Sequence, residues 1–461
     1  MAKSKVYYEC SHCGHTTVKW MGQCPSCNQW HTFQEFQKQK ESERIRHKIE
    51  LTDEAGRESG ATPKKLAEID VSGGNRTSTG LPELDRVLGG GLMPASLILL
   101  GGDPGIGKST LMLHVAKSRP DLEILYVAGE ESAGQIRQRA DRIGIQSSEL
   151  RVVSDTDLDR VISLVQKEKP QLLVIDSIQT VYRSQLAGLP GSVQQVRECA
   201  ALLQQVAKKE GVTTLMIGHV TKEGDIAGPR VLEHMVDTVL QFEGDQSRLH
   251  RLLRCVKNRF GAAHEVGVFE MGEQGLTEVD NPSSLFLSDH DQQVSGNVVT
   301  CIMEGSRPIL VEVQALVTPG TYGVPQRTAS GFDQRRLSLL IAVLEKRVGL
   351  KLSDQDVYLN IAGGLKVTDT AADLAVITAL ASSFGERALA PRTVVVGEAG
   401  LGGELRNVPH LEQRLREADK MGFERALIPS VSRSLRGVEG LVLSEKHSIG
   451  HAIRELLDTS S

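Results

Sequence analysis

Aromatic residues and long hydrophobic runs are both scarce in this sequence. Phe, Trp and Tyr make up only 4% of the 461 residues, so we expect an aliphatic core. No stretch reaches the roughly 18 consecutive apolar residues of a membrane-spanning helix. The first residues, MAKSKVYYECSHC, also lack the apolar core of a signal peptide. We therefore expect no membrane partner and a cytoplasmic location.

The sequence also lacks an excess of either charge. It has 53 Lys and Arg against 58 Asp and Glu, for a formal net charge of −5. This balance does not exclude nucleic-acid binding, because a local basic stripe is enough to hold phosphates. At roughly 100–200 residues per domain, the length predicts about two to four domains. Patterning divides the chain into a cysteine-rich segment (1–36), a charged linker (37–65), a strand–helix region (66–280) and a C-terminal region (285–457).

An evenly spaced disulfide framework is missing as well, because four of the seven cysteines cluster near the start of the chain. They form two CxxC pairs, a spacing that closes a four-thiolate zinc site and would supply the folding free energy of so short a segment. A redox CxxC is the alternative, but no thioredoxin-like βαβ pattern surrounds these pairs. The predicted zinc ligands are Cys10, Cys13, Cys24 and Cys27. Such a ribbon can bind DNA, RNA or protein.

The strand–helix region predicts an α/β domain. Short Val, Ile and Leu runs alternate with helical patterns, which is typical of a mainly parallel sheet built from βαβ units. The runs are residues 96–102, 123–129, 171–177 and 213–220, and one intervening helix is 194–209. A hairpin is predicted over 249–271 with its turn at 258–262. The C-terminal region predicts an α+β domain with strands at 298–303, 310–316, 357–361 and 393–396 and helices at 334–348, 371–382 and 411–421. The isolated Cys199, Cys255 and Cys301 are predicted to be inert core residues.

A phosphate-binding loop follows the first of these strands. The segment GDPGIGKST matches GxxxxGK[ST] between a strand and a helix, which is the context this motif requires. Its backbone N–H groups and the helix N-terminus would surround the phosphates of ATP. Lys108 would reach the β- and γ-phosphates, and the Ser109 hydroxyl would ligate Mg²⁺. The predicted nucleotide-binding residues are Gly102, Asp103, Pro104, Gly105, Ile106, Gly107, Lys108, Ser109 and Thr110.

Three later strand ends carry groups suited to ATP hydrolysis. Asp176 ends an apolar strand, where a carboxylate would hold the Mg²⁺ shell. Glu130 and Glu131 follow another strand, where one carboxylate would activate the attacking water. Which of the two acts is open, and a helix-capping acidic turn is the alternative for the pair. His219 would sense the γ-phosphate or be an ordinary core histidine.

The residues so far resemble a known family. STGLPELDRVLGGGLMPASLILLGGDPGIGKST (78–110) is similar to the start of a RecA-type ATPase core. Together with the four-cysteine ribbon and Lys257-Asn-Arg-Phe-Gly261, it resembles the bacterial RadA (Sms) family over essentially the whole chain. The resemblance implies a core like that of hexameric replicative helicases, binding to single-stranded and branched DNA, and branch migration with the RecA recombinase. It also implies Lys108, Ser109, Asp176 and Glu130 as ATPase residues.

Lys257 and Arg259 correspond to the motif that resembles the helicase finger. Two residues apart on a strand, they would project to one face and could reach the γ-phosphate of a neighbouring subunit in a ring. A solvated hairpin tip is the alternative. The segments 184–193 and 222–230 are predicted DNA-facing loops, because Gly and small polar residues allow close approach to a backbone. The basic residues expected to meet phosphates there are Arg183, Lys222 and Arg230.

The C-terminal region resembles the proteolytic domain of Lon proteases at 363–383 and 396–423. That chemistry needs a nucleophilic Ser activated by Lys. The Ser position falls at Ala372 and the Lys position at Glu412, so we expect the fold without the protease activity. The domain would then serve ring assembly and offer basic residues to DNA: Arg327, Arg335, Arg336, Lys346 and Arg347.

Three functions are compatible with these motifs. The first is an ATP-driven DNA motor in recombination and repair, with ATP, Mg²⁺ and Zn²⁺ as cofactors. The second is a non-motor mediator that uses ATP to load or unload a recombinase. The third, an ATP-dependent Lon-like protease, conflicts with Ala372 and Glu412.

Overall fold

The computed structural model describes most of the chain after residue 74. The described residues are 6–10, 16–25, 29–37, 65, 75–145, 149–186, 188–219, 232–244, 250–287, 294–320, 325–430, 435 and 437–458. They divide into two compact units, the first comprising 1–243, 253–263 and 272–276 and the second 244–252, 264–271 and 277–461. No helix among the described residues is long and apolar enough to cross a membrane.

The N-terminal segment forms a small antiparallel sheet in the order β2-β1-β3. Its strands are β1 (Val6–Cys10), β2 (Thr16–Thr17) and β3 (Phe33–Gln37). Cys10 lies opposite Phe33 in the β1–β3 register, and both are buried together with Cys24. The Cys24 N–H donates to the Gln29 carbonyl (2.9 Å). These few residues are the core of the ribbon, which is too small to fold by apolar burial alone.

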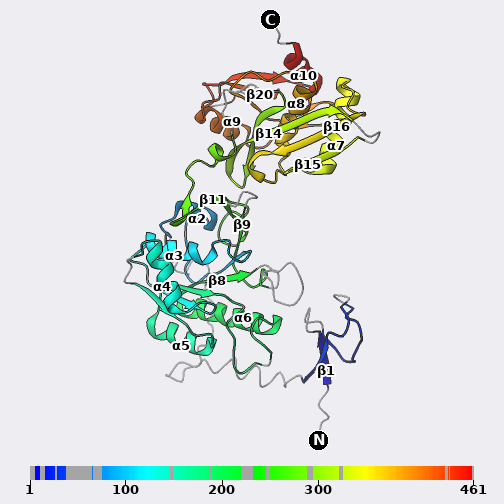
Figure 1. Cartoon of the computed structure of the whole chain (residues 1–461). Helices are drawn as coiled ribbons and strands as arrows, with labels where there is room; N and C mark the ends of the chain where they lie inside the picture. Colours follow the sequence, from blue (N-terminus) through cyan, green and yellow to red (C-terminus); the bar gives the residue numbers. More distant parts are fainter. Residues whose placement is uncertain are drawn as a thin grey trace. The chain divides into compact units, whose positions relative to one another are not determined.

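The middle of the chain forms a nine-stranded sheet in the described region, in the order β12-β11-β10-β9-β4-β8-β7-β5-β6 (Figure 1). The six strands from β9 to β6 pair in parallel, as predicted for a βαβ region. The strands are β4 (Leu97–Gly102), β5 (Ile124–Ala128), β6 (Leu150–Val153), β7 (Leu172–Asp176), β8 (Thr213–His219), β9 (Thr238–Gly244), β10 (His250–Asn258), β11 (Val266–Gly272) and β12 (Gly275–Glu278). The four predicted buried runs are β4, β5, β7 and β8.

Amphipathic helices cover this sheet. They are α2 (Pro82–Leu88), α3 (Lys108–Ser118), α4 (Ala133–Arg142), α5 (Leu158–Glu168) and α6 (Val193–Glu210), the last within two residues of its predicted bounds. Apolar residues of α5 and α6 pack against the sheet in one buried cluster that includes Leu99, Leu173 and Met216. In Figure 1 both helices lie below strand β8. Ser192 begins α6 by accepting from the Gln195 N–H, and Gly211 ends it in the left-handed conformation. The sequence analysis missed β6 and β9, because β6 is only half-buried and β9 lacks a clear period.

The C-terminal unit contains a mixed seven-stranded sheet in the order β15-β16-β14-β13-β17-β20-β21 within its described residues. Its elements are β13 (Asn297–Glu304), β14 (Arg307–Pro319), β15 (Arg327–Ser330), α7 (Gln334–Val343), β16 (Gln355–Ile361), α8 (Asp373–Phe384), β17 (Thr393–Val395), α9 (Leu411–Lys420), β20 (Arg425–Pro429), β21 (Val442–Lys446) and α10 (Ile449–Asp458). The apolar helix α8 lies against β13 and β14 in the centre of the core. The predicted helix 334–348 is α-helical to Val343 and continues as a π-helical turn, Leu344–Val348.

Candidate nucleotide-binding site

The phosphate-loop motif lies between β4 and α3, at the carboxyl end of the central parallel strand. Gly107 sits at the N-cap of α3 with a φ of 116°, a left-handed conformation that a residue with a Cβ avoids. This allows the chain to enter the helix directly at Lys108, so that the helix N-terminus and the backbone N–H groups face the expected phosphate position. The motif residues Gly102 to Thr110 are therefore together in one turn, as the sequence predicts.

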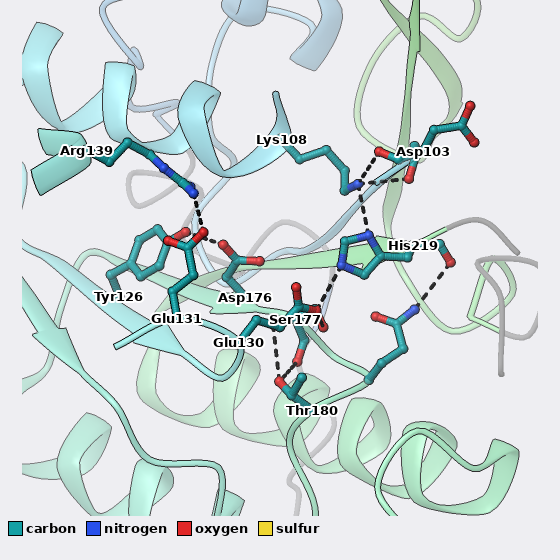
Figure 2. Close-up of polar contacts among 12 residues, drawn as sticks. Asp103, Lys108, Tyr126, Glu130, Glu131, Arg139, Asp176, Ser177, Thr180 and His219 are labelled. Atoms are coloured by element: carbon teal, nitrogen blue, oxygen red, sulfur yellow. Dashed lines mark hydrogen bonds and ion pairs between the residues drawn. The ribbon is translucent and has the colours of Figure 1, made fainter. Parts of the chain in front are cut away.

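Lys108 is buried in this loop and uses all three of its N–H groups. Its Nζ donates to the carbonyls of Gly102 (2.8 Å) and Asp103 (2.9 Å) and contacts Nδ1 of His219 at 3.2 Å (Figure 2). Burial lowers the pKa of Lys108, whereas the charge of Asp176 and of two other carboxylates opposes that shift. A bound phosphate would give the Lys108 ammonium a charged acceptor in place of a neutral one, and hydrogen bonds to charged acceptors are stronger.

Asp176 ends β7 next to the phosphate loop and is buried. It accepts a hydrogen bond from the Tyr126 hydroxyl on the neighbouring strand β5 (Figure 2). Burial, together with the charge of Asp176, raises the pKa of Tyr126 well above its ordinary value. Asp176 forms no ion pair with Lys or Arg among the described residues, and its carboxylate and the Ser109 hydroxyl are hard oxygen donors that suit Mg²⁺.

Glu130 lies just beyond β5 and is held at one carboxylate oxygen. Its Oε1 accepts from the Ser177 hydroxyl (2.7 Å) and contacts Nε2 of His219 (2.9 Å). Gly129 makes this position possible, because a Cβ there would collide with the Thr180 hydroxyl, which itself donates to the Ser177 carbonyl (2.8 Å). The second oxygen of Glu130 is left to orient a water molecule.

Glu131 occupies a different environment from its neighbour. It forms an ion pair with Arg139 of α4, and its Oε2 is buried with no hydrogen-bond partner among the described residues (Figure 2). Of the two carboxylates left open by the sequence, Glu130 is the one that contacts His219, which in turn contacts Lys108.

His219 ends β8 and joins two of the predicted residues. One ring nitrogen contacts Lys108 and the other contacts Glu130 (Figure 2). A neutral ring that accepts at Nδ1 from the Lys108 ammonium and donates from Nε2 to the Glu130 carboxylate satisfies both contacts. The arrangement places His219 between the phosphate-loop lysine and the acidic pair.

The Lys257–Gly261 motif is divided between two environments. The Lys257 ammonium donates to the carbonyls of Glu233 (2.6 Å) and Val236 (2.9 Å) in its own chain. Burial lowers the pKa of Lys257, and the charge of Arg259 adds to the shift. Arg259 is exposed over half of its side chain and has one contact of 3.3 Å with Asp237. Of the two predicted finger residues, Arg259 is thus the one whose side chain is half-exposed.

Two family models match the chain. One, described as an AAA domain, covers residues 62–225, and the other, a rubredoxin metal binding domain, covers residues 8–35. Curated relatives named DNA repair protein RadA match nearly end to end. The protein of Bacillus subtilis is 49% identical over 94% of each chain, and those of Halalkalibacterium halodurans and Listeria monocytogenes are 48% identical over 93% of each chain. This chain belongs to the RadA family.

Solved structures add little to this assignment of the RadA-family chain. A KaiC-like protein of Pyrococcus horikoshii covers 45% of this chain and 99% of its own length at 21% identity and a TM-score of 0.38. A RadB recombinase covers 44% and 99% at 24% identity and a TM-score of 0.35. Similarities of this size carry no argument about function. The AAA match itself supports ATP binding and hydrolysis, and the rubredoxin match supports zinc.

Two of the four predicted zinc ligands of this RadA-family chain can be described. Cys10 and Cys24 are both buried, and the Cys10 thiol contacts the Thr32 hydroxyl at 3.1 Å. Cys13 and Cys27 lie outside the described residues, as do the charged linker apart from Gln37 and Lys65, the loop 222–230, and Ala187 in the other predicted DNA loop. Two buried thiols in a segment without another core fit a zinc site.

The remaining predicted residues are in the C-terminal unit. Ala372 is buried just before α8, and Glu412 lies in the first turn of α9, within 3.8 Å of Arg416. Ser382 and Ser383 are not available as substitute nucleophiles, because their hydroxyls accept from the Gly296 N–H and the Val317 N–H (2.9 Å each).

Two of the arginines expected to meet DNA are already engaged. Arg336 forms a two-nitrogen ion pair with Asp373 at the start of α8, which argues against a DNA contact by this residue. Burial raises the pKa of Asp373, and the Arg336 hydrogen bond opposes that shift. Arg183 pairs with Asp159 at 3.1 Å. The sequence alone did not reveal these two ion pairs, because each acidic partner is far away along the chain. No ion pair is found for the other candidates of the C-terminal unit among its described residues: Arg327, Arg335, Lys346 and Arg347.

Sequence reasoning missed three residues of the site: Tyr126, Ser177 and Arg139. In the sequence, Tyr126 looks like any other residue of a buried strand, and Ser177 looks like the last residue of another buried strand. The available signal was a hydroxyl group inside or directly after a buried apolar run, because a buried hydroxyl needs a partner.

Proposed function

We propose that this RadA-family chain is an ATP-driven DNA motor in DNA repair and recombination. It binds single-stranded and branched DNA, hydrolyses ATP and drives branch migration of recombination intermediates together with the RecA recombinase. The observation that carries the proposal is the hydrogen-bonded chain Lys108–His219–Glu130 at the carboxyl edge of the sheet. The relatives' name, DNA repair protein RadA, supports the process.

ATP hydrolysis follows from the chemistry of these groups. Lys108 would stabilise charge on the β- and γ-phosphates, and Ser109 and Asp176 would hold Mg²⁺, which supplies positive charge for the phosphates when it is bound. Glu130 accepts a proton from the attacking water, a role worth about 10²–10⁴-fold in rate. The fixed Oε1 and the available Oε2 suit this role, because one oxygen orients the side chain and the other binds water.

His219 provides a route from nucleotide to DNA. A γ-phosphate would accept the N–H of Lys108 that now points at Nδ1 of His219. That ring nitrogen would lose its partner, while Nε2 of His219 would keep its contact with Glu130. The ring is therefore expected to change position with ATP. His219 is the last residue of β8, and the predicted DNA loop 222–230 follows in sequence, so the state of the nucleotide would bias that loop.

The finger assignment requires a ring, and we propose a homo-oligomer that forms a hexameric ring like that of the helicases it resembles. Arg259 is half-exposed, whereas Lys257 is bound to its own chain. In a ring, Arg259 would stabilise transition-state charge at the neighbour's γ-phosphate, a contribution of about 10³–10⁵-fold. The C-terminal unit would act as a scaffold without protease activity, because the methyl side chain of Ala372 cannot act as a nucleophile.

The test is unwinding of a forked DNA substrate by the purified chain, with ATP and with or without RecA. We expect ATP-dependent unwinding that RecA increases. Lys108→Ala is expected to abolish it, whereas Lys117→Ala, on the exposed face of α3, is the matched control and should keep it. A strict requirement for RecA would favour the mediator, and cleavage of an unfolded protein substrate with ATP would favour the protease.

A further inference from the structure

Ser177 is buried next to two residues of the proposed ATPase site. It follows Asp176, the last residue of β7, and Glu130 lies two residues beyond β5, the neighbouring strand in the sheet. Ala128 and Asp176 are register partners, and the Gly129 N–H donates to the Asp176 carbonyl (2.7 Å). The two strand ends therefore stay side by side beyond their last register pair, which brings Ser177 next to Glu130.

The Ser177 side chain donates to the carboxylate of Glu130. Its hydroxyl oxygen lies 2.7 Å from Oε1, and the hydrogen must point at Glu130, because a carboxylate can only accept (Figure 2). Ser177 is 0% exposed, whereas the Glu130 side chain is 43% exposed. A carboxylate at the surface of the site is thus tied to a buried group. Hydrogen bonds to a charged acceptor are stronger than neutral ones.

The backbone of Ser177 is fixed independently of this hydroxyl. Its N–H donates to Oγ1 of Thr180 (3.3 Å), and its carbonyl accepts from the Thr180 hydroxyl (2.8 Å). Thr180 occupies the space that a Cβ on Gly129 would need, so the two strand ends are in close contact here. An alanine at position 177 would keep these backbone bonds and lose only the bond to Glu130. Local folding therefore does not explain the hydroxyl.

The two partners of Glu130 Oε1 differ in what controls them. Nε2 of His219 lies 2.9 Å from this oxygen, but Nδ1 of the same ring contacts Lys108, the predicted phosphate ligand (3.2 Å). In the proposed function, the His219 ring changes position when a γ-phosphate binds. The Ser177 hydroxyl belongs instead to the end of β7, and its bond does not depend on Lys108. Ser177 is therefore the partner that can hold Glu130 with and without nucleotide.

We propose that Ser177 is a positioning residue for the base: its hydroxyl holds Oε1 of Glu130 beside the strand end that carries Asp176, and Oε2 stays available to the attacking water. The inference rests on the proposed ATPase function and deepens the role given there to Glu130. Ser177 acts through Glu130 and not on the substrate. The same bond sets the position of the base relative to a predicted Mg²⁺ ligand, since Asp176 and Ser177 are adjacent in the chain.

The first test compares Ser177→Ala with the unchanged full-length chain in nucleotide binding and in ATP hydrolysis. Without the hydroxyl, the Glu130 side chain can turn away from the water. Since a misplacement of about 1 Å can cost about 10²-fold in rate, we expect kcat to fall by about 10–100-fold. The Kd of a fluorescent ATP analogue should stay within about twofold, because Ser177 contributes to the position of the base and not to phosphate binding.

A double variant provides the readout that a merely structural role would not move. In Glu130→Gln the base is absent, so Ser177 has no base to position. Adding Ser177→Ala to Glu130→Gln should change the single-turnover rate of ATP hydrolysis by less than about twofold, because residues that act as a unit are not additive. A further loss as large as that seen in the chain with Glu130 would identify general damage and overturn the proposal.

Thr214→Val is the matched control. Thr214 is buried in β8 of the same sheet, and its hydroxyl has no hydrogen-bond partner among the described residues. This variant should keep the kcat of the unchanged chain.

Two further outcomes decide the proposal. An unchanged kcat in Ser177→Ala would overturn it and leave the ATPase function intact, whereas absence of ATP hydrolysis in the unchanged chain would overturn both. Ser177→Cys keeps the size of the side chain but has only a weak S–H donor, so its kcat should also fall. If Ser177→Ala does not fold, an unchanged kcat in Ser177→Cys would overturn the proposal in its place.

Discussion

At the scale of single residues, two adjacent carboxylates have become chemically different. Glu130 and Glu131 follow the same strand, but one contacts Ser177 and His219 and the other pairs with Arg139. Since Gly129 lets the backbone pass close to Thr180, Glu130 turns toward the nucleotide and Glu131 toward α4. The difference arises from one missing Cβ and from partners that are distant in sequence.

The first prediction separates the two carboxylates. Glu130→Gln keeps the shape and the hydrogen bonds to one oxygen but removes the base, so kcat for ATP should fall by about 10²–10⁴-fold while nucleotide binding remains. Glu131→Gln is the matched control and should change kcat by much less, because it affects only the ion pair with Arg139. Steady-state ATPase assays and nucleotide titrations measure both. A larger loss in Glu131→Gln would reverse the assignment.

At the scale of elements, the Lys257–Gly261 motif closes the end of helix α2. Asn258 donates to the Leu88 carbonyl (3.0 Å), which also accepts from Arg76 (2.8 Å). Gly89, in the left-handed conformation, ends the helix. Its backbone lies so close to Gly261 that a Cβ on Gly89 would be 3.3 Å from the Gly261 Cα. Part of the motif therefore serves folding, and Arg259 extends from an anchored segment.

The second prediction distinguishes these roles within one motif. Asn258→Ala should lower the free energy of unfolding by about 1–3 kcal/mol, because the Leu88 carbonyl at the buried end of α2 loses one of its hydrogen-bond donors. Arg259→Ala should change stability by less than about 0.5 kcal/mol, because the side chain is half-exposed. It should nevertheless abolish DNA unwinding while keeping nucleotide binding. Thermal melts and forked-substrate assays on both variants test this. Normal unwinding by Arg259→Ala would contradict the finger assignment.

The zinc ribbon provides the third prediction, also at the scale of elements. The chain has two Trp residues, and both, Trp20 and Trp30, belong to the ribbon and are exposed. Tryptophan emission therefore reports on the ribbon alone. Cys24→Ser or a chelator should release zinc and change this emission, without shifting the melting of the ATPase region.

Cys199→Ala is the control for the zinc experiment. Burial raises the pKa of Cys199 to about 12, which makes the thiolate form needed for metal binding unfavourable. This variant should keep its zinc and its Trp emission. Stoichiometric zinc in Cys24→Ser would contradict the four-cysteine site.

At the scale of the whole molecule, the proposed motor needs more than one chain. The residues proposed as phosphate ligand, base and Mg²⁺ ligands come from one chain, and the half-exposed Arg259 lies in a separate segment. In the proposed ring, each site would be completed by a residue from the neighbouring chain, which is the geometry of a heterologous interface. A net charge of −5 is compatible with DNA binding if the basic residues gather where the DNA passes.

The fourth prediction tests this shared site by mixing two inactive variants. Lys108→Ala removes the phosphate ligand, and Arg259→Ala removes the finger, so each protein alone should have little DNA-stimulated ATPase activity. In a random equal mixture, about a quarter of the interfaces have an intact Lys108 on one side and an intact Arg259 on the other. DNA-stimulated activity should therefore reappear on mixing. If it does not while the two proteins co-assemble, Arg259 does not act across the interface.

Much of this molecule follows from local sequence. The phosphate loop, the four buried strands and helix α6 were predicted within a few residues, because a Gly-rich turn, apolar runs and a 3.6-residue period are local signals. Lys108 and Asp176 are also found from local context, since one belongs to a motif and the other ends a buried strand. Family membership comes from the same residues.

Only the tertiary structure decided which groups meet. The contacts of His219 with Lys108 and Glu130, the hydrogen bond from Tyr126 to Asp176 and the pairing of Arg336 with Asp373 join residues from separate strands and helices. The position after the strand did not separate Glu130 from Glu131, although the family resemblance pointed to Glu130, and the motif placed Lys257 beside Arg259 as a second finger residue. Hydrogen bonds and desolvation depend on distances of a few ångströms, and the order in which strands pair, not their order along the chain, sets those distances.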